Sequence, residues 1–132
     1  MRTALIALAV LVVLVVAVRW FAGGGERAEP AEVAAAAESG ALFLDVRRPG
    51  EFAAGHVQGA RNADVLADDF RERVAGFDRD QTVYVYCASG MRSGRAAKVL
   101  DELGFQRVVN AGGVGDLRGA GVPMTQSPGR GG

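Results

Sequence analysis

The hydrophobic residues of this chain form one long uninterrupted run followed by several short ones. The long run covers residues 3–18 and lies between Arg2 and Arg19. A membrane-spanning helix needs about 20 apolar residues, whereas a cleaved signal peptide has an apolar core of about 7 to 15. We expect residues 1–22 to form a hydrophobic helix that stays as a membrane anchor, with a cleaved signal segment as the alternative. Either interpretation predicts that the remaining chain faces the periplasm or the outside of the cell.

Beyond this run, short apolar stretches alternate with amphipathic ones. The apolar, β-branched stretches predict strands over residues 41–46, 82–86 and 107–110. The spacing of apolar residues predicts a short helix after Pro30, an amphipathic helix over 65–77, a third helix that ends at Gly104, and a last helical segment after Gly113. Strands that alternate with helices indicate the α/β class, with a central parallel sheet flanked by helices.

Glycine, proline and polar residues mark the limits of the folding unit. Residues 23–29, with three consecutive glycines, predict a flexible linker, and residues 125–132 predict a disordered tail. Residues 30–124 remain, which is the size of one domain.

Charge and cysteine content exclude several classes of function. The 15 basic and 15 acidic residues balance, so we expect no nucleic-acid partner. One cysteine and one histidine exclude an internal disulfide and a cysteine-rich zinc site, so we expect no metal.

The candidate chemistry lies where the second predicted strand ends, at Cys87. A helix is expected to begin about five residues later, so the intervening loop is short: Ala88, Ser89, Gly90, Met91 and Arg92. The carboxyl ends of strands in an open α/β sheet are where ligands bind. We expect the backbone amides from Ala88 to Ser93 to surround the sulfur, which would lower the pKa of the thiol. The alternative is that Cys87 is a small buried apolar residue.

Three segments of the sequence resemble the rhodanese family, in particular its small single-domain periplasmic members. They are LDVRRPGEFAAGHVQGARN at residues 44–62, the loop segment at 85–97, and NAGGVGDLRGAGVP at 110–123. Together they cover nearly all of residues 31–124. Leu117 stands where many relatives carry tryptophan, which should change packing more than chemistry. The resemblance implies a rhodanese-like domain and a thiosulfate sulfurtransferase that carries sulfur as a persulfide on Cys87.

The resemblance also implies roles for individual residues. Thiosulfate or a similar compound would donate sulfur, and cyanide or a thiol would accept it, in ping-pong fashion and without a metal or organic cofactor. Arg92, and more weakly Arg95, would pair with the anionic donor. Asp45 and Arg47 could lie behind the loop, although these positions and Glu51 look like packing and ion-pair residues, and His56 looks like part of a structural turn.

Two other functions remain open from the sequence. The chain could be a carrier that receives a persulfide from a partner and has little activity on thiosulfate. A phosphatase is disfavoured, because phosphatases with a related loop place arginine six residues after the cysteine, and this chain has Ser93 there.

Overall fold

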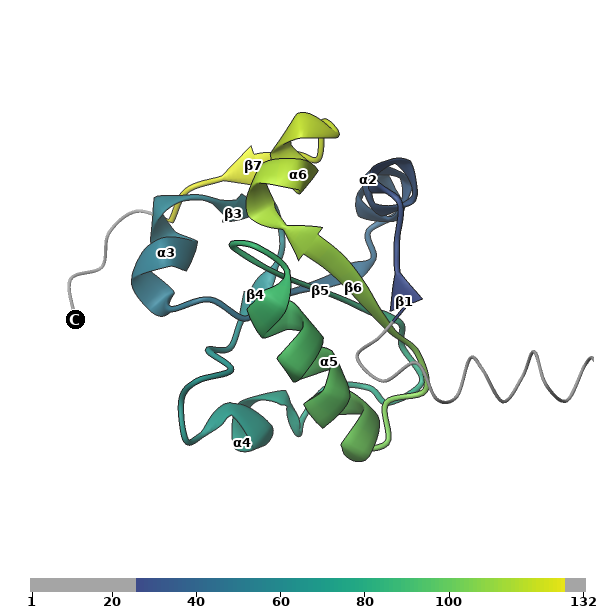
Figure 1. Cartoon of the computed structure of the whole chain (residues 1–132), viewed down its shortest axis with the longest axis vertical. Coiled ribbons are helices and arrows are strands. Elements are labelled where there is room, and N and C mark those ends of the chain that lie inside the picture. The colour runs from purple at the N-terminus through teal and green to yellow at the C-terminus, as the bar shows by residue number, and fades with distance from the viewer. Residues whose placement is uncertain (1–25, 128–132) are drawn as a thin grey trace, which may run out of the picture.

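The short apolar segments form a five-stranded parallel sheet (Figure 1) in the computed structural model, which describes residues 26–127. Each strand is parallel to its neighbours. In spatial order the strands are β1 (Glu26–Arg27), β6 (Val108–Gly113), β5 (Val83–Cys87), β2 (Leu42–Asp45) and β4 (Arg61–Asn62). A separate antiparallel pair joins β3 (His56–Val57) to β7 (Met124–Thr125).

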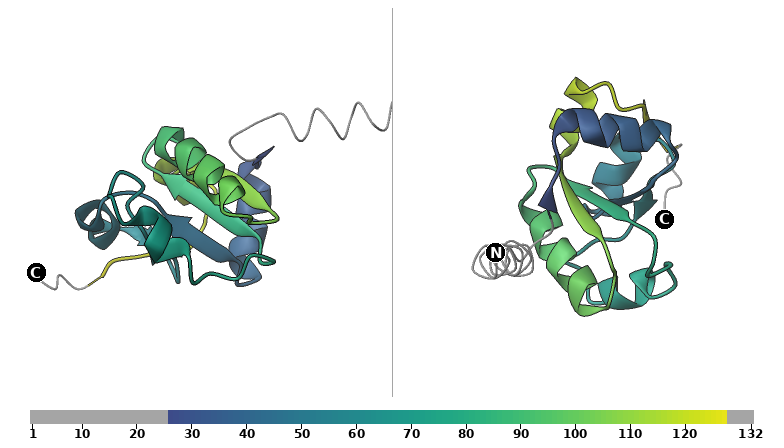
Figure 2. Two further views of the ribbon diagram at one scale, coloured as in Figure 1. Left: turned by 90° about the horizontal axis from the view of Figure 1, so that it is seen from below. Right: turned by 90° about the vertical axis from the view of Figure 1, so that its right-hand side faces the viewer.

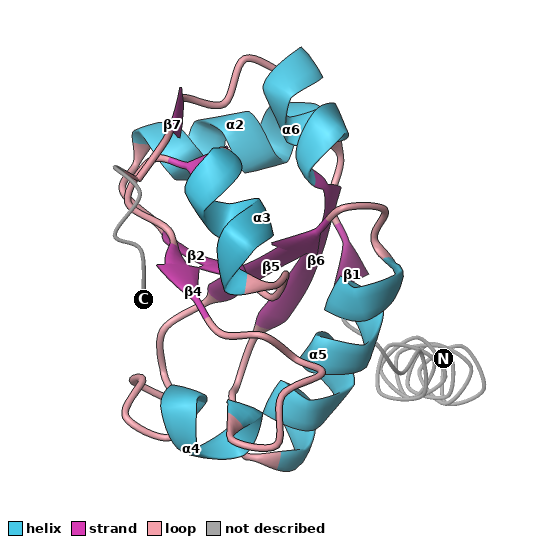
Figure 3. Cartoon of the chain, turned by 90° about the vertical axis from the view of Figure 1, so that its left-hand side faces the viewer, coloured by secondary structure: helices cyan, strands magenta, loops and turns pink. Residues whose placement is uncertain are grey.

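Helices cover both faces of the sheet. They are α2 (Pro30–Glu38), α3 (Pro49–Ala54), α4 (Phe70–Val74), α5 (Met91–Glu102) and α6 (Val114–Gly119). Figure 3 shows α4 and α5 on one side of the sheet and α2 and α6 on the other, and Figure 2 shows the same layers from two further directions. The predicted α/β architecture, with a parallel sheet flanked by helices, is confirmed.

The alternation of side chains along β5 divides the interior into two cores. Val83, Val85 and Cys87 belong to the core under α4 and α5. Tyr84 and Tyr86 face the other way, against the core under α2 and α6. Successive side chains of a strand point to opposite faces, so β5 contributes to both cores and is fixed as the central strand. This packing fixes the position of Cys87 at its carboxyl end.

The predicted limits of the domain differ from the structure at both ends. Glu26–Arg27, within the predicted linker of residues 23–29, pairs with β6 as an edge strand. Thr125, the first residue of the predicted tail of residues 125–132, pairs with His56, and the amide of Ser127 donates to the carbonyl of Ala53. These polar segments are ordered by backbone hydrogen bonds, which hydrophobic patterning does not report.

The predicted hydrophobic helix of residues 1–22 lies outside the described residues. Within residues 26–127, no helix is both long enough and apolar enough to cross a membrane.

Two predicted local structures also differ. Of the helix expected over 65–77, only α4 forms. The residues before it make a turn, because the side chain of Asp64 accepts the amide of Leu66 and the backbone carbonyl of Asp64 accepts the amide of Ala67. Such a side-chain bond competes with helix formation. Leu66 is consequently 48% exposed. Conversely, no helix is predicted between the strand at 41–46 and residue 65, but Pro49 begins α3, where proline suits the first helical position.

Candidate functional site

The loop after β5 closes around the sulfur of Cys87. Cys87 is the last residue of β5, and α5 begins at Met91. The amide of Gly90 donates a hydrogen bond to Sγ at 2.9 Å. Gly90 has a φ of +94°, a left-handed conformation that favours glycine and that directs this amide inward. The predicted curl of the loop around the sulfur is therefore present, with Gly90 as its turning point.

Hydrogen bonds stabilise the ionised sulfur. Burial alone would raise the pKa of Cys87, but it is outweighed by hydrogen bonds from the Ser93 hydroxyl and from the amides of Ser93, Ser89 and Gly90. The net pKa of the thiol is lower than its ordinary value. A thiolate is the nucleophilic form of cysteine, so this loop favours the reactive state.

Cys87 has no exposed surface, although Ala88, Ser89 and Met91 of the loop are exposed. The sulfur is therefore buried, with polar groups of the loop on one side and the apolar core on the other. Because Cys87 has no exposed surface, a reactant reaches the sulfur only when a neighbouring residue moves.

Ser93 and Asn110 form a buried polar network behind the sulfur. The Ser93 hydroxyl lies 3.6 Å from the Cys87 Sγ, 2.9 Å from the Gly90 carbonyl and 2.8 Å from the Asn110 Oδ1. Asn110 also accepts the amide of Gly112 at 3.0 Å. A hydroxyl has a single proton, so Ser93 donates to one acceptor at a time, and an ionised sulfur competes for that proton.

The end of β6 supports the loop from below. A Cβ atom added at Gly113 would lie 2.6 Å from the carbonyl oxygen of Ala88 and 3.4 Å from the Cα of Ser89. Only a residue without a side chain allows this approach of backbone to backbone.

Arg92 is paired with Glu51 in a two-pronged ion pair. Its two terminal nitrogens lie 2.8 and 3.0 Å from the two carboxylate oxygens of Glu51. The hydrogen bonds from Arg92 lower the pKa of Glu51 from 4.5 to about 2. The role of Arg92 toward an anionic donor stays a prediction, and in this structure its guanidinium faces a carboxylate of the same chain.

Asp45 and Arg47 form a second, buried ion pair. Arg47 donates to Asp45 through Nε at 3.0 Å and Nη2 at 2.7 Å, and Nη2 also donates to the Gly55 carbonyl. The Arg47 guanidinium lies 5.8 Å from the ring of Tyr86, whose hydroxyl accepts the amide of Val57. Each charge of the pair is therefore compensated by the other. Through Arg47 the pair connects the end of β2 to the end of α3, which is a structural role.

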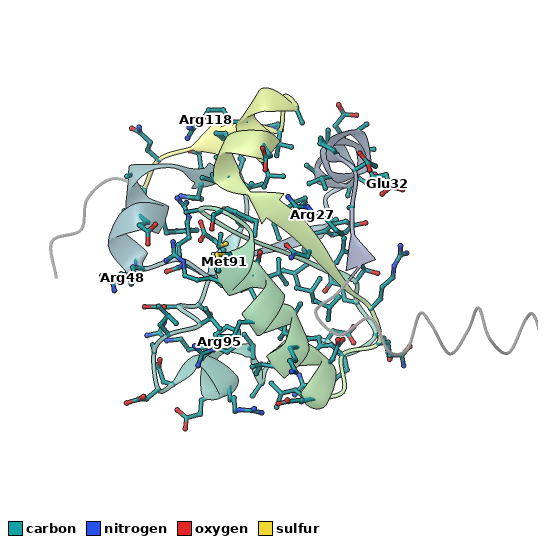
Figure 4. All side chains as sticks on the ribbon, in the orientation of Figure 1. Arg27, Glu32, Arg48, Met91, Arg95 and Arg118 are labelled. Atoms are coloured by element: carbon teal, nitrogen blue, oxygen red, sulfur yellow. The ribbon has the colours of Figure 1, made fainter. Side chains whose placement is uncertain are left out.

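The remaining candidates are either exposed or have a structural partner. Met91 is 82% exposed, and Arg95 lies further along α5 (Figure 4). The Nδ1 of His56 bonds the carbonyl of Phe52, and its ring stacks on Phe52 at 3.6 Å, which gives it a structural partner. Among the described residues, no group of three or more potential metal ligands is present.

Two contributors, Asn110 and Gly113, are absent from the sequence-based set of site residues. Their contacts join β6 to a loop about twenty residues earlier in the chain. The Gly-Gly pair at 112–113 indicates a turn or a close backbone approach, but the sequence does not show that Gly113 approaches the loop after Cys87.

A parallel α/β sheet with a cysteine at the carboxyl end of its central strand and a short loop curled over the sulfur defines a rhodanese-like domain. The model of that domain family, described as Rhodanese-like domain, matches residues 29–116, and the chain belongs to the rhodanese family. The predicted family is confirmed, and so is the expectation that the chain is an enzyme.

The chain is similar to relatives that are named as thiosulfate sulfurtransferases or rhodaneses. It is 42% identical to the thiosulfate sulfurtransferase PspE of Escherichia coli over 77 residues, which cover 57% of this chain and 72% of that protein. It is 32% identical over 104 residues to the thiosulfate sulfurtransferase GlpE of Pseudomonas aeruginosa, covering 79% of this chain and 93% of the relative. A solved structure described as a rhodanese with anions from E. coli superimposes with a TM-score of 0.56 at 38% identity, covering 66% of this chain and 100% of the other.

Proposed function

We propose that the chain is a thiosulfate sulfurtransferase that works through a persulfide on Cys87. The Cys87 thiolate attacks the outer sulfur of thiosulfate. A bond forms between Sγ and that sulfur, the sulfur–sulfur bond of the donor breaks, and its electron pair leaves with sulfite. The outer sulfur then passes to cyanide or to a thiol, and the Cys87 thiolate is restored.

The observation that carries this proposal is the hydrogen bond from the Gly90 amide to the Cys87 Sγ. Together with the amides of Ser89 and Ser93, it offers positive ends of backbone dipoles to a negatively charged sulfur. The same donors suit the terminal sulfur of a persulfide, which carries the same charge slightly further from the backbone.

The alternative is a carrier that receives its sulfur from a partner protein. Two observations favour it: Arg92 is already paired with Glu51, and Cys87 has no exposed surface. Both would slow sulfur transfer from a small anionic donor, because the donor needs an unpaired cation for binding and an accessible Cys87 sulfur for reaction.

Formation of thiocyanate from thiosulfate and cyanide distinguishes the two functions. The full-length protein should turn over, and Cys87→Ser should abolish turnover. Absence of turnover in the wild-type protein, with a persulfide still formed from a protein donor, would support the carrier instead.

We also propose that residues 1–22 attach the protein to a membrane, with the rhodanese-like domain in the periplasm or outside the cell. The apolar run at 3–18 supports this, and export with signal cleavage is the alternative. Mass spectrometry of the native N-terminus, combined with membrane fractionation, tests it. A soluble protein that keeps Met1 would contradict both versions.

A further inference from the structure

A pocket of about 400 Å³ lies at the carboxyl edge of the sheet, on the β1 side of the active loop. It is lined by the end of β1, the start of α2, the end of β6 and the start of α6: Arg27, Ala28, Glu29, Pro30, Ala111 and Asp116. Because β1, β6 and β5 are parallel neighbours, this pocket opens on the same edge of the sheet as Cys87.

Arg27 joins the pocket to the active loop. It ends β1 opposite Asn110 of β6, and Figure 4 shows it between β6 and α2. Its Nη1 lies 3.8 Å from the position that a Cβ would occupy on Gly90, and its Nη2 lies 3.5 Å from the corresponding position on Gly112. The guanidinium therefore lies beside Gly90, the residue whose amide donates to the Cys87 sulfur. Arg27 also precedes residues 29–116, the span that matches the family model.

The charges of the pocket are mixed. The Asp116 Oδ2 lies 3.7 Å from the Cβ position on Gly112, so Asp116 and Arg27 flank the same glycine. Glu29 adds a second carboxylate to the lining. One cation and two carboxylates disfavour a dianion such as thiosulfate. They complement a small molecule that carries one negative and one positive group.

We propose that this pocket binds the sulfur acceptor, and that the acceptor is a thiol with an amino-acid head group. Arg27 binds its carboxylate and Asp116 binds its ammonium group, which brings its thiol to the active loop. The proposal rests on the proposed function, since it needs the Cys87 persulfide.

The transfer step is a simple exchange between sulfurs. The acceptor thiolate attacks the outer sulfur of the persulfide, a new sulfur–sulfur bond forms on the acceptor, and the bond to the Cys87 Sγ breaks. The electron pair of that bond stays on Sγ as the thiolate. The product is the persulfide of the acceptor, and no oxidant or reductant is consumed.

Three small thiols test the contributions of Arg27 and Asp116 separately. L-cysteine has both charged groups, 3-mercaptopropionate has only the carboxylate, and cysteamine has only the ammonium group. The experiment measures kcat/KM for each thiol, relative to cyanide, with thiosulfate as donor and the full-length protein. Arg27→Gln should lower the relative value about tenfold for L-cysteine and 3-mercaptopropionate but not for cysteamine, as expected for one lost charge-assisted hydrogen bond.

Asp116→Asn should give the complementary pattern, lowering the relative value for L-cysteine and cysteamine but not for 3-mercaptopropionate. Arg107→Gln is the matched control. Arg107 is an exposed arginine just before the amino end of β6, whereas the pocket lies at the carboxyl ends of the strands. It should leave all three ratios unchanged.

The outcomes distinguish this inference from the proposed function. If the wild-type protein forms no thiocyanate, the sulfurtransferase proposal fails and the acceptor pocket fails with it. If cyanide is turned over but Arg27→Gln and Asp116→Asn change all thiols equally, or change none, the pocket assignment alone is overturned.

Discussion

Gly113→Ala tests whether the backbone of β6 sets the position of the active loop. The new Cβ would lie 2.6 Å from the Ala88 carbonyl oxygen, a distance that real Cβ contacts essentially never show, and the neighbouring atom belongs to backbone. Either the loop or β6 must move. Overpacking of this kind costs about 1–3 kcal/mol. At about 2 kcal/mol, the melting temperature of a domain of this size should fall by roughly 10 °C.

The same substitution should reduce activity more than stability alone explains. A displacement of the loop moves the amides of Ser89 and Gly90 relative to the sulfur, and a misplacement of about 1 Å can cost on the order of a hundredfold in rate. Calorimetry gives the stability change, and thiocyanate formation well below the melting temperature gives the rate.

Gly115→Ala is the control, because nothing lies within 4 Å of its Cβ position and alanine favours the helix α6 in which it lies. It should leave the rate unchanged and the melting temperature unchanged or higher. If Gly113→Ala behaves like Gly115→Ala, the argument that this glycine supports the loop is refuted.

Further substitutions probe the site. Ser93→Ala removes a hydrogen bond to the sulfur, so the pKa of the active-loop thiol should rise and its alkylation by iodoacetamide should need higher pH; an unchanged pH profile would contradict this role. Glu51→Gln should cost about 1 kcal/mol, because both partners of the pair with Arg92 are partly exposed. The pKa of Glu51 is lower in the folded protein than in the unfolded chain. The difference in free energy of unfolding between the wild-type protein and Glu51→Gln should therefore be complete above pH 4.5 and disappear as the pH falls through about 2, which urea denaturation at several pH values checks. Asp45→Ala leaves the buried Arg47 unpaired and should cost about 3–5 kcal/mol, while Asp45→Ala combined with Arg47→Met should recover part of that loss in the same denaturation assay.

The central strand and the loop could be predicted because their signals are local. The β-branched and aromatic residues before Cys87 indicate a buried strand, and Gly90 supplies the left-handed turn that a short loop needs. Gly90 is the residue just before α5. The end of the strand and the start of the helix could therefore both be predicted from residues close to Cys87.

The partners of the site residues could not be predicted, because they depend on tertiary contacts. Arg92 and Glu51 are separated by 41 positions, and no spacing in the sequence shows that their side chains meet. Asn110 reaches Ser93 only because β6 pairs with β5. Strand β1 has two residues and no apolar pattern, and it exists because β6 offers it a free edge.

Mass spectrometry of the thiosulfate-treated protein tests the central claim most directly. After the donor is removed, the wild-type protein should have gained one sulfur atom, located on the peptide that contains Cys87, and addition of cyanide should remove it. Cys87→Ser should gain none. A wild-type protein that stays at its original mass, while its thiol still reacts with iodoacetamide, would contradict the account.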